Sequence, residues 1–280
     1  MPELPEVETV RRGIIPLLEG RALSRVIQRR DTLRIPLPEN FADRLTGRRI
    51  DKITRRAKYL LFALDQGETL ICHLGMSGKM TLVARAGRET PDIFAKHDHV
   101  ILENDQGDLV IFNDPRRFGL MTLCATEELD QHRLFCQMGP EPLGNAFHSD
   151  YLFDKMRGKR SPVKTVLLDQ RVVVGLGNIY VCEALYLAGI SPLRPATDLD
   201  RETVERLVPI IRQVLARAIE AGGSTLKDYA RVDGELGYFQ HEFKVYGREG
   251  EACHTTGCDH SIVRIPQSGR STFYCPACQD

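Results

Sequence analysis

The feature that most limits how this chain can fold is a group of four cysteines near its C-terminal end. They follow the pattern Cys253-x4-Cys258-x16-Cys275-x2-Cys278, in which a hairpin-length segment separates two close pairs. Two thiolate pairs at such a spacing are typical of a closed, tetrahedral zinc site with a structural role. Disulfide bonds are the alternative, which an intracellular location disfavours. We therefore predict one structural Zn²⁺ held by these four cysteines.

The composition of the whole chain is that of a globular protein, and we expect neither a membrane span nor a secretory signal. The chain has 280 residues, enough for two domains, with 42% hydrophobic and 27% charged residues. No apolar run approaches ~20 residues, and the start lacks a basic-then-apolar signal pattern. We expect an intracellular, cytoplasmic protein.

The charge balance gives no general sign of nucleic-acid binding. The 38 basic and 38 acidic residues cancel, whereas binding to DNA depends on neutralising phosphates. Between Arg21 and Lys58, however, basic residues outnumber acidic ones. Such a cluster is usually only a solvated face, but a neutral total still permits a local basic groove.

The first half of the chain is predicted to form one helix followed by short strands. Apolar Val7, Val10, Ile14 and Leu17 recur at helical spacing, and Gly20 follows as a stop signal. The alternating apolar stretches beyond it favour a β-sandwich or flattened barrel, against which the helix packs. The predicted strands are 23–27, 50–53, 59–64, 69–74, 79–83, 100–103, 109–113 and 120–123.

The second half has a helical pattern. It begins after a segment rich in turn formers at 138–149. Helices are predicted over 162–168 and 178–188, and a longer amphipathic helix over 204–219. Pro209 lies inside the last of these, where a proline can kink a helix. The fold class is therefore α+β, with a β domain followed by a helical one.

The first residues carry a candidate nucleophile. If the initiator methionine is removed, Pro2 becomes an N-terminal secondary amine that can attack an aldehyde-level carbon and form an iminium. An α-amino group has a pKa near ~8, about two units below that of lysine, so more of it is neutral at physiological pH. Glu3 lies beside it and can shuttle a proton. The alternative is that these residues only begin a helix, since Pro5 suits a first turn. A retained Met1 would block the nucleophile.

Several stretches together resemble the formamidopyrimidine-DNA glycosylases, in the superfamily that also contains endonuclease VIII. They are Pro-Glu-Leu-Pro-Glu-Val-Glu-Thr at 2–9, Gly-Leu-Gly-Asn-Ile-Tyr at 175–180 and Arg-Ser-Thr at 270–272, and the likeness recurs along nearly the whole chain. The resemblance implies bacterial base-excision repair in which oxidised purines, 8-oxoguanine and formamidopyrimidines, leave duplex DNA. The abasic strand is then cut by β,δ-elimination. It also implies a monomeric, nucleoid-associated enzyme that binds damaged double-stranded DNA and needs no redox cofactor.

The same resemblance implies four catalytic residues. Pro2 forms the Schiff base and Glu3 handles protons. Lys58, which ends a basic run, contacts the lesion phosphates and donates a proton in the first elimination. Arg270, between the cysteine pairs, grips phosphates and serves the second elimination, which suits the bidentate geometry of a guanidinium. Taken alone, Lys58 and Arg270 are ordinary solvated side chains.

The implied DNA contacts form a second set. They are Met76, His97, Arg116, Phe118, Lys159 and Asn178. Met76 is flexible, Phe118 is flat and Arg116 can pair with an orphan base edge, properties that suit a wedge replacing an extruded nucleotide. Asn178 begins a helix after a glycine turn, where backbone amides favour a phosphate. Without the resemblance, a loop methionine or phenylalanine is more often part of a core.

The resemblance also divides the chain into domains. It implies an N-terminal catalytic β-sandwich domain at 1–137, a linker at 138–149, a helix-two-turn-helix DNA-binding domain at 150–250 and a zinc finger at 251–280. A lesion-capping loop is expected within 224–246. One departure concerns the first cysteine pair, which the family usually separates by two residues instead of four. His254 and His260 are near enough to replace a cysteine on zinc, so the ligand set stays open.

Two other functions compete with a purine-specific glycosylase. Endonuclease VIII prefers oxidised pyrimidines, but its members typically begin Pro-Glu-Gly-Pro, whereas this chain has Leu4 and the complete Arg116-Arg117-Phe118 sequence. A zinc-ribbon protein that binds nucleic acid without catalysis is the second alternative. It leaves Pro2 and Glu3 without a role.

Overall fold

The computed structural model describes residues 2–83, 94–224 and 238–280, and the chain forms two compact units. The first unit contains residues 1–136 together with 222–238. The second contains residues 137–221 and 239–280. The chain therefore leaves the first unit and returns to it briefly at 222–238. None of the helices in the described ranges is long and apolar enough to span a bilayer.

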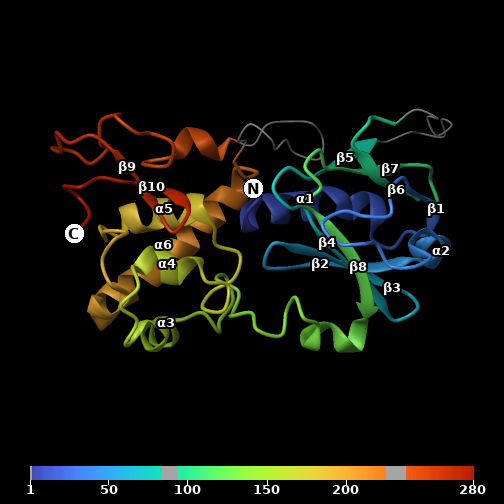
Figure 1. Ribbon diagram of the computed structural model, residues 1–280, viewed down its shortest axis with the longest axis horizontal. Coiled ribbons are helices and arrows are strands. Elements are labelled where there is room, and N and C mark those ends of the chain that lie inside the picture. Colours follow the sequence, from blue (N-terminus) through green and yellow to red (C-terminus); the bar gives the residue numbers. More distant parts are fainter. Residues whose placement is uncertain (1, 84–93, 225–237) are drawn as a thin grey trace. The chain divides into compact units, whose positions relative to one another are not determined.

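The first unit is built on two four-stranded antiparallel sheets, with strand orders β2-β3-β4-β8 and β1-β6-β7-β5 (Figure 1). The strands are β1 (Leu23–Gln28), β2 (Ile50–Arg56), β3 (Tyr59–Leu64), β4 (Glu68–His73), β5 (Lys79–Val83), β6 (Asp98–Asn104), β7 (Leu109–Asn113) and β8 (Leu120–Ala125). All eight predicted strands are present, and the α+β fold class is confirmed.

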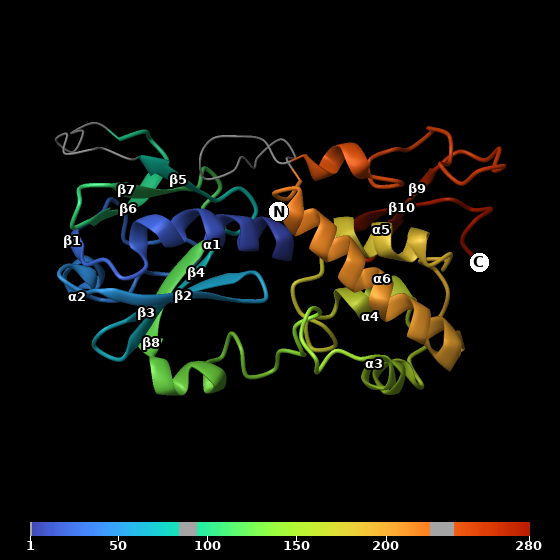
Figure 2. The same cartoon turned by 180° about the vertical axis from the view of Figure 1, so that it is seen from behind.

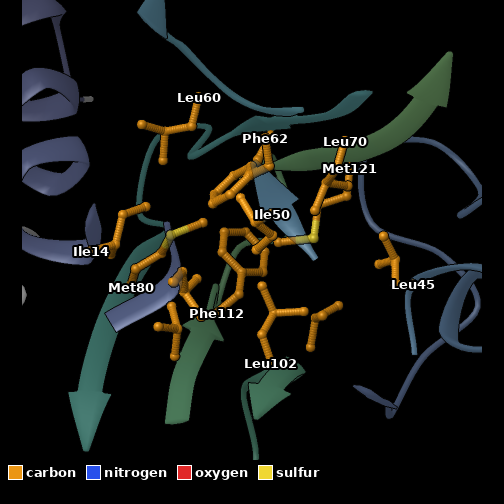
Figure 3. Packing of buried hydrophobic residues seen from close by; sticks show 14 of the residues in the cluster. Ile14, Leu45, Ile50, Leu60, Phe62, Leu70, Met80, Leu102, Phe112 and Met121 are labelled. Atoms are coloured by element: carbon orange, nitrogen blue, oxygen red, sulfur yellow. The ribbon is translucent and has the colours of Figure 1, made fainter. Parts of the chain in front are cut away.

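One hydrophobic core lies between the two sheets. Successive side chains of a strand point to opposite faces, so alternate residues of each strand reach this core. In β3 these are Leu60 and Phe62, and in β6 and β7 they include Leu102 and Phe112 (Figure 3). Ile101 and its neighbours on the other face of β6 and β7 form a separate apolar cluster.

The helix α1 (Leu4–Leu18) packs on β2 and β3 and adds its apolar stripe to the same core. Val7, Val10 and Ile14 are buried as predicted, and the last turn is completed by Leu18, which is more buried than Leu17. A short helix α2 (Phe41–Leu45), which the sequence pattern did not indicate, also contributes to the core.

The second unit consists of helices and a two-stranded hairpin (Figure 2). The helices are α3 (Ser149–Met156), α4 (Val163–Leu168), α5 (Asn178–Leu187) and α6 (Arg201–Glu220), and the hairpin strands are β9 (Val263–Gln267) and β10 (Arg270–Tyr274). The helix α6 runs through Pro209 and buries its predicted apolar stripe. α3 and α4 pack against α6 and α5, respectively, and β10 packs on α5. The helix α3 was not predicted.

Three short 3-10 segments also lie in the described part of the chain. They are η1 (Thr126–Gln131), η2 (Ala196–Asp198) and η3 (Phe239–Glu242). The stretch predicted as a linker at 138–149 contains turns and ends where α3 begins. Residues 225–237 of the expected lesion-capping loop lie outside the described residues.

Candidate active site and metal centre

The candidate nucleophile stands at the buried beginning of α1. Glu3 is the N-cap residue and is only 3% exposed, and Pro2 beside it is also buried. Glu3 and Glu6 form a reciprocal capping box, in which the Glu6 Oε2 accepts the Glu3 backbone N–H at 2.8 Å. The first turn of α1 is therefore closed by hydrogen bonds between Glu3 and Glu6.

Glu6 has a second role that the sequence did not indicate. Its Oε1 accepts the backbone N–H of Ser224 at 2.8 Å and the Ser224 hydroxyl at 3.0 Å. A Cβ added to Gly223 would lie 3.1 Å from the same oxygen, so a glycine permits this close approach. The carboxylate thus ties the first turn of α1 to the end of the described segment that precedes residues 225–237.

Lys58 lies in a tight turn between β2 and β3. Arg56 pairs with Tyr59, so only Ala57 and Lys58 form the turn, and Ala57 has a left-handed φ of 54°. Arg55 donates to the Ala57 carbonyl at 2.7 Å and also contacts the carboxylate of Glu8 in α1 at 3.3 Å. Lys58 is 8% exposed, so it is a buried cation and not the ordinary solvated lysine of the alternative interpretation.

His73, at the end of β4, is a residue near this turn that the sequence analysis did not select. Burial lowers its pKa to about 4, and the positive charges of Lys58 and Arg34 act in the same direction. Its Nδ1 accepts the Gly75 backbone N–H at 2.9 Å, which leaves Nε2 to carry the proton. His73 is therefore a neutral hydrogen-bond donor beside Lys58. Its occurrence in the His-Leu-Gly-Met-Ser-Gly stretch was the available signal.

The depressed pKa of His73 predicts how stability depends on pH. The folded form prefers the neutral ring, so its contribution is complete above pH 6.5 and is lost as the pH falls towards 4. The loss amounts to about 3 kcal/mol. Denaturant unfolding of the protein and of His73→Asn, whose amide oxygen can still accept from Gly75, is the measurement. The stability difference between them should change across this pH window, and a constant difference would contradict the assignment.

The residues expected to replace an extruded nucleotide lie on two loops of the first unit. Met76 is 38% exposed and Phe118 is 43% exposed, which is uncommon for large apolar side chains in this protein. The Arg116 guanidinium lies over the Phe118 ring, 4.8 Å from its centroid. His97 is half-buried, just ahead of β6, and its carbonyl accepts the backbone N–H of Asp114 at 3.0 Å. The alternative that Met76 and Phe118 are core residues is therefore wrong.

In the second unit, Asn178 is the first residue of α5 and its side chain holds the hairpin. Its Nδ2 donates to the Ser271 carbonyl at 2.8 Å, while its buried Oδ1 has no hydrogen-bond partner among the residues that the structure describes. Lys164 of α4, 1% exposed, donates to the Thr272 hydroxyl at 2.5 Å and to the same Ser271 carbonyl at 3.3 Å. The sequence analysis missed this buried lysine, whose neighbours come from a distant part of the chain.

Arg270 projects from the tip of the hairpin that Lys164 and Asn178 hold. Ser268 and Gly269 form the two-residue turn with φ values of 49° and 73°, the conformation of a type I′ hairpin. Arg270 follows it and is exposed. Lys159 lies between α3 and α4 and is half-buried. The hairpin that presents the Arg270 guanidinium to an anion is therefore held in place by the hydrogen bonds from Lys164 and Asn178.

The four cysteines predicted to bind zinc come together in the second unit. Their sulfur atoms all lie within 4.8 Å of one another, with 3.8 Å between Cys253 and Cys278 and 3.7 Å between Cys258 and Cys275. Tetrahedral bonds of about 2.3 Å to a common ion place sulfur atoms about 3.8 Å apart, so the donor set fits a four-thiolate metal site. Within the described residues this cluster contains the four cysteine sulfur atoms and no histidine nitrogen, which favours the four-cysteine ligand set over one with His254 or His260.

The cysteine cluster is joined to the helices by an apolar contact layer. Tyr186 of α5 packs with Phe273 of β10 and contacts Cys253, its hydroxyl lying 3.3 Å from the sulfur. Glu183 of the same helix accepts the backbone N–H groups of residues 244–246 at 2.8–3.0 Å. Burial raises the pKa of Glu183, although these three donors act in the opposite direction. The hairpin is thus part of the second unit's fold.

The predicted site residues are divided between the two units. The first unit contains the catalytic candidates Pro2, Glu3 and Lys58. It also contains the candidate DNA contacts Met76, His97, Arg116 and Phe118. Lys159, Asn178, Arg270 and the cysteines belong to the second. Within the first unit the structure groups Lys58 with His73, and Met76 with Phe118. Within the second it groups Asn178 with the hairpin that carries Arg270.

Two family models match this chain. The formamidopyrimidine-DNA glycosylase N-terminal domain matches residues 1–121, and the H2TH domain of the same glycosylase matches residues 138–230. Curated relatives are similar over their full length and that of this chain. The formamidopyrimidine-DNA glycosylases of Ruegeria pomeroyi and of a Jannaschia species are 57% and 58% identical to it, respectively.

Solved structures are similar over almost the entire chain. The crystal structure of the MutM (Fpg) protein from Thermus thermophilus has a TM-score of 0.87 and 41% identity, with 99% of this chain and 98% of that chain covered. A complex of the Lactococcus lactis Fpg with DNA containing an abasic site has a TM-score of 0.89 and 36% identity, with 99% of both chains covered. This chain belongs to the formamidopyrimidine-DNA glycosylase family.

Proposed function

We propose that this protein is a bifunctional DNA glycosylase and lyase that removes oxidised purines, 8-oxoguanine and formamidopyrimidines, from duplex DNA. The observation that carries the proposal is the fixed, buried Pro2-Glu3 pair at the start of α1, in a chain of this family. Related Lactococcus lactis structures hold DNA with a Fapy-dG lesion and DNA with an abasic site. Those two ligands correspond to a substrate and to the intermediate after base loss.

The proposed chemistry begins at the Pro2 nitrogen. Its lone pair attacks C1′ of the extruded nucleotide, the glycosidic bond breaks, and the base leaves with a proton while the sugar ring opens to an iminium. Loss of a C2′ proton then expels the 3′ phosphate, and a second elimination expels the 5′ phosphate. Glu3 moves protons at C1′ and the sugar. The iminium accepts the electron pairs, so no redox cofactor takes part.

The remaining candidate residues hold the DNA in this proposal. Lys58 is a buried cation suited to the lesion phosphates and to protonating a leaving phosphate in the first elimination. Arg270 takes the same part in the second elimination. Lys159, Asn178 and His97 bind the backbone, which fixes the register on the duplex.

The metal proposed for the four-cysteine cluster is Zn²⁺. Four thiolates and a tetrahedral arrangement are typical of structural zinc sites. All four ligand positions are taken by protein atoms, so the ion supports the hairpin that carries Arg270 and takes no part in the chemistry.

Borohydride trapping tests the nucleophile. Incubation with an 8-oxoguanine duplex and sodium borohydride should reduce the iminium and leave a covalent protein–DNA adduct. Mass spectrometry should place the adduct on a peptide that begins at Pro2, with Met1 absent. Parallel reactions without borohydride should give a one-nucleotide gap with phosphate at both ends.

The controls for trapping are a Pro2→Gly variant and a duplex with undamaged guanine. Both are expected to give far less adduct. Strand cleavage without any adduct at residue 2 would refute the nucleophile but keep the activity. DNA retention without cleavage would instead favour the non-catalytic zinc-ribbon alternative, and a preference for an oxidised pyrimidine would favour an endonuclease VIII-like substrate range.

A further inference from the structure

The two loops that carry Met76 and Phe118 are joined by one buried carboxylate. Asp114 is fully buried, with 0% of its surface exposed. Its Oδ1 accepts the Ser77 hydroxyl at 2.8 Å, and its Oδ2 accepts the Gly119 backbone N–H at 2.8 Å. Ser77 directly follows Met76, and Gly119 directly follows Phe118. Each of the two exposed apolar residues is therefore next to a residue bound by Asp114.

The backbones of the two loops also touch. Gly75, with a φ of 67°, lies so close to the other loop that an added Cβ would be 2.3 Å from the Phe118 carbonyl carbon. A Cβ on Gly119 would be 2.7 Å from the Phe112 ring and 3.1 Å from the Asp114 carboxylate. A side chain at Gly75 would displace the other loop, and one at Gly119 would displace the Phe112 ring and the His73 carbonyl at the end of β4. The two loops are in contact without intervening side chains.

A third segment is bound to the same residue through its main chain. The Asp114 N–H donates to the His97 carbonyl at 3.0 Å, and the Nε2 of the buried His99 donates to the Asp114 carbonyl at 2.9 Å. Both the backbone and the carboxylate of Asp114 are thus used for contacts with other segments. Loss of the carboxylate would be costly, because its two donors, the Ser77 hydroxyl and the Gly119 N–H, would be left buried and unsatisfied.

We propose that Asp114 is a positioning residue that holds Met76 and Phe118 together as a preformed wedge for nucleotide extrusion. This inference rests on the proposed function. Extrusion costs a few kcal/mol of unpairing and unstacking, which the wedge must offset when it enters the duplex. Two independent loops would lose conformational entropy at that moment, whereas loops already joined do not. Asp114 itself touches no reacting atom.

The test compares two substrates that differ in the need for base extrusion. Asp114→Ala should slow excision from a duplex with 8-oxoguanine opposite cytosine by about 100-fold, the scale of loss expected from a misplacement of about 1 Å. Cleavage of the same duplex with a ready-made abasic site should fall much less, since no base is unpaired there. Stopped-flow fluorescence of 2-aminopurine beside the lesion should show the loss in the extrusion step itself.

Three further variants keep this result interpretable. Ser77→Ala removes one of the two ties and should give a smaller loss of the same kind, even if Asp114→Ala does not fold. Asp114→Asn can accept from Gly119 with its oxygen and donate to Ser77 with its nitrogen, so it should restore most of the excision rate. Thr69→Val removes a different hydrogen bond of the first unit, in which the hydroxyl of the buried Thr69 lies 2.8 Å from that of Thr126, and should leave both reactions unchanged.

The results distinguish a failure of the positioning role of Asp114 from a failure of the proposed glycosylase activity. Equal losses on both substrates for Asp114→Ala and Ser77→Ala, or no loss beyond that of Thr69→Val, would overturn the positioning role. An unaltered protein that cuts neither substrate would overturn the proposed function instead.

Discussion

Replacement of Glu3 by glutamine is expected to reduce base excision by about 10²- to 10⁴-fold, the usual contribution of a positioned acid or base. The side chain is 3% exposed at the start of α1, directly beside Pro2, so a proton moved there passes through a group shielded from bulk water. Glutamine has the same shape but does not transfer protons at neutral pH. Single-turnover excision of 8-oxoguanine is the measurement, and the affinity for the lesion duplex should stay within about 3-fold because the side chain's size is kept.

The matched control for this prediction is Glu19→Gln. Glu19 caps the other end of the same helix and accepts the Ile53 N–H at 2.7 Å, a bond that a glutamine oxygen can keep. Its excision rate should not change. If Glu3→Gln excised at the normal rate, or lost activity only in proportion to a fall in melting temperature, Glu3 would be a helix cap and nothing more.

Removal of the metal from the four-cysteine site is expected to weaken the binding of DNA. Structural zinc sites contribute about 10–16 kcal/mol of apparent binding free energy. The hairpin has only two strands, and the apolar cluster through which it packs on α5 contains Cys253 and Cys275, so loss of the metal disturbs that packing. A strong chelator, or Cys275→Ser, should therefore unfold the β9–β10 hairpin and release Arg270 from its position. The loss of one charge-assisted phosphate contact predicts a 10- to 100-fold weaker affinity for DNA, on the order of 1.5–3 kcal/mol, with a salt dependence reduced by about one unit.

Elemental analysis and DNA titrations at several salt concentrations measure this outcome. Cys136→Ser is the matched control, since Cys136 is exposed and lies outside the cysteine cluster. It should keep one zinc per chain and full affinity. A Cys275→Ser protein with normal affinity would show that the hairpin does not need the metal, and a different metal in the purified protein would refute zinc.

The strands and the principal helices were predictable because their signals are local. The alternation in β3 and β6 follows from a two-residue repeat that one buried face imposes on each strand. The stripe of α6 and the spacing of the cysteine pairs also lie within single short segments. The short helices α2 and α3 were missed, because five to eight residues hold too little periodic pattern to distinguish a helix from a turn.

The roles of Pro2 and Glu3 stay a prediction. They were proposed from the chemistry of the two side chains and from their position in the sequence. The residues that hold the site were not predictable. Glu6 meets Ser224, 218 positions away, and Lys164 meets Thr272, 108 positions away. Nothing in the local pattern of either residue marks its partner.

The order of residues by itself determined which segments become strands and helices and which cysteines can form a metal site, and it led to the proposal of Pro2 as the amine of an iminium. These properties depend on side-chain chemistry and on repeats of a few residues. Only the tertiary structure decided that Glu6, Asp114 and Lys164 are buried polar centres that hold the candidate residues of their own units. A polar side chain becomes such a centre when the fold removes water from it and supplies donors or acceptors in return, and those partners come from segments that only folding brings together.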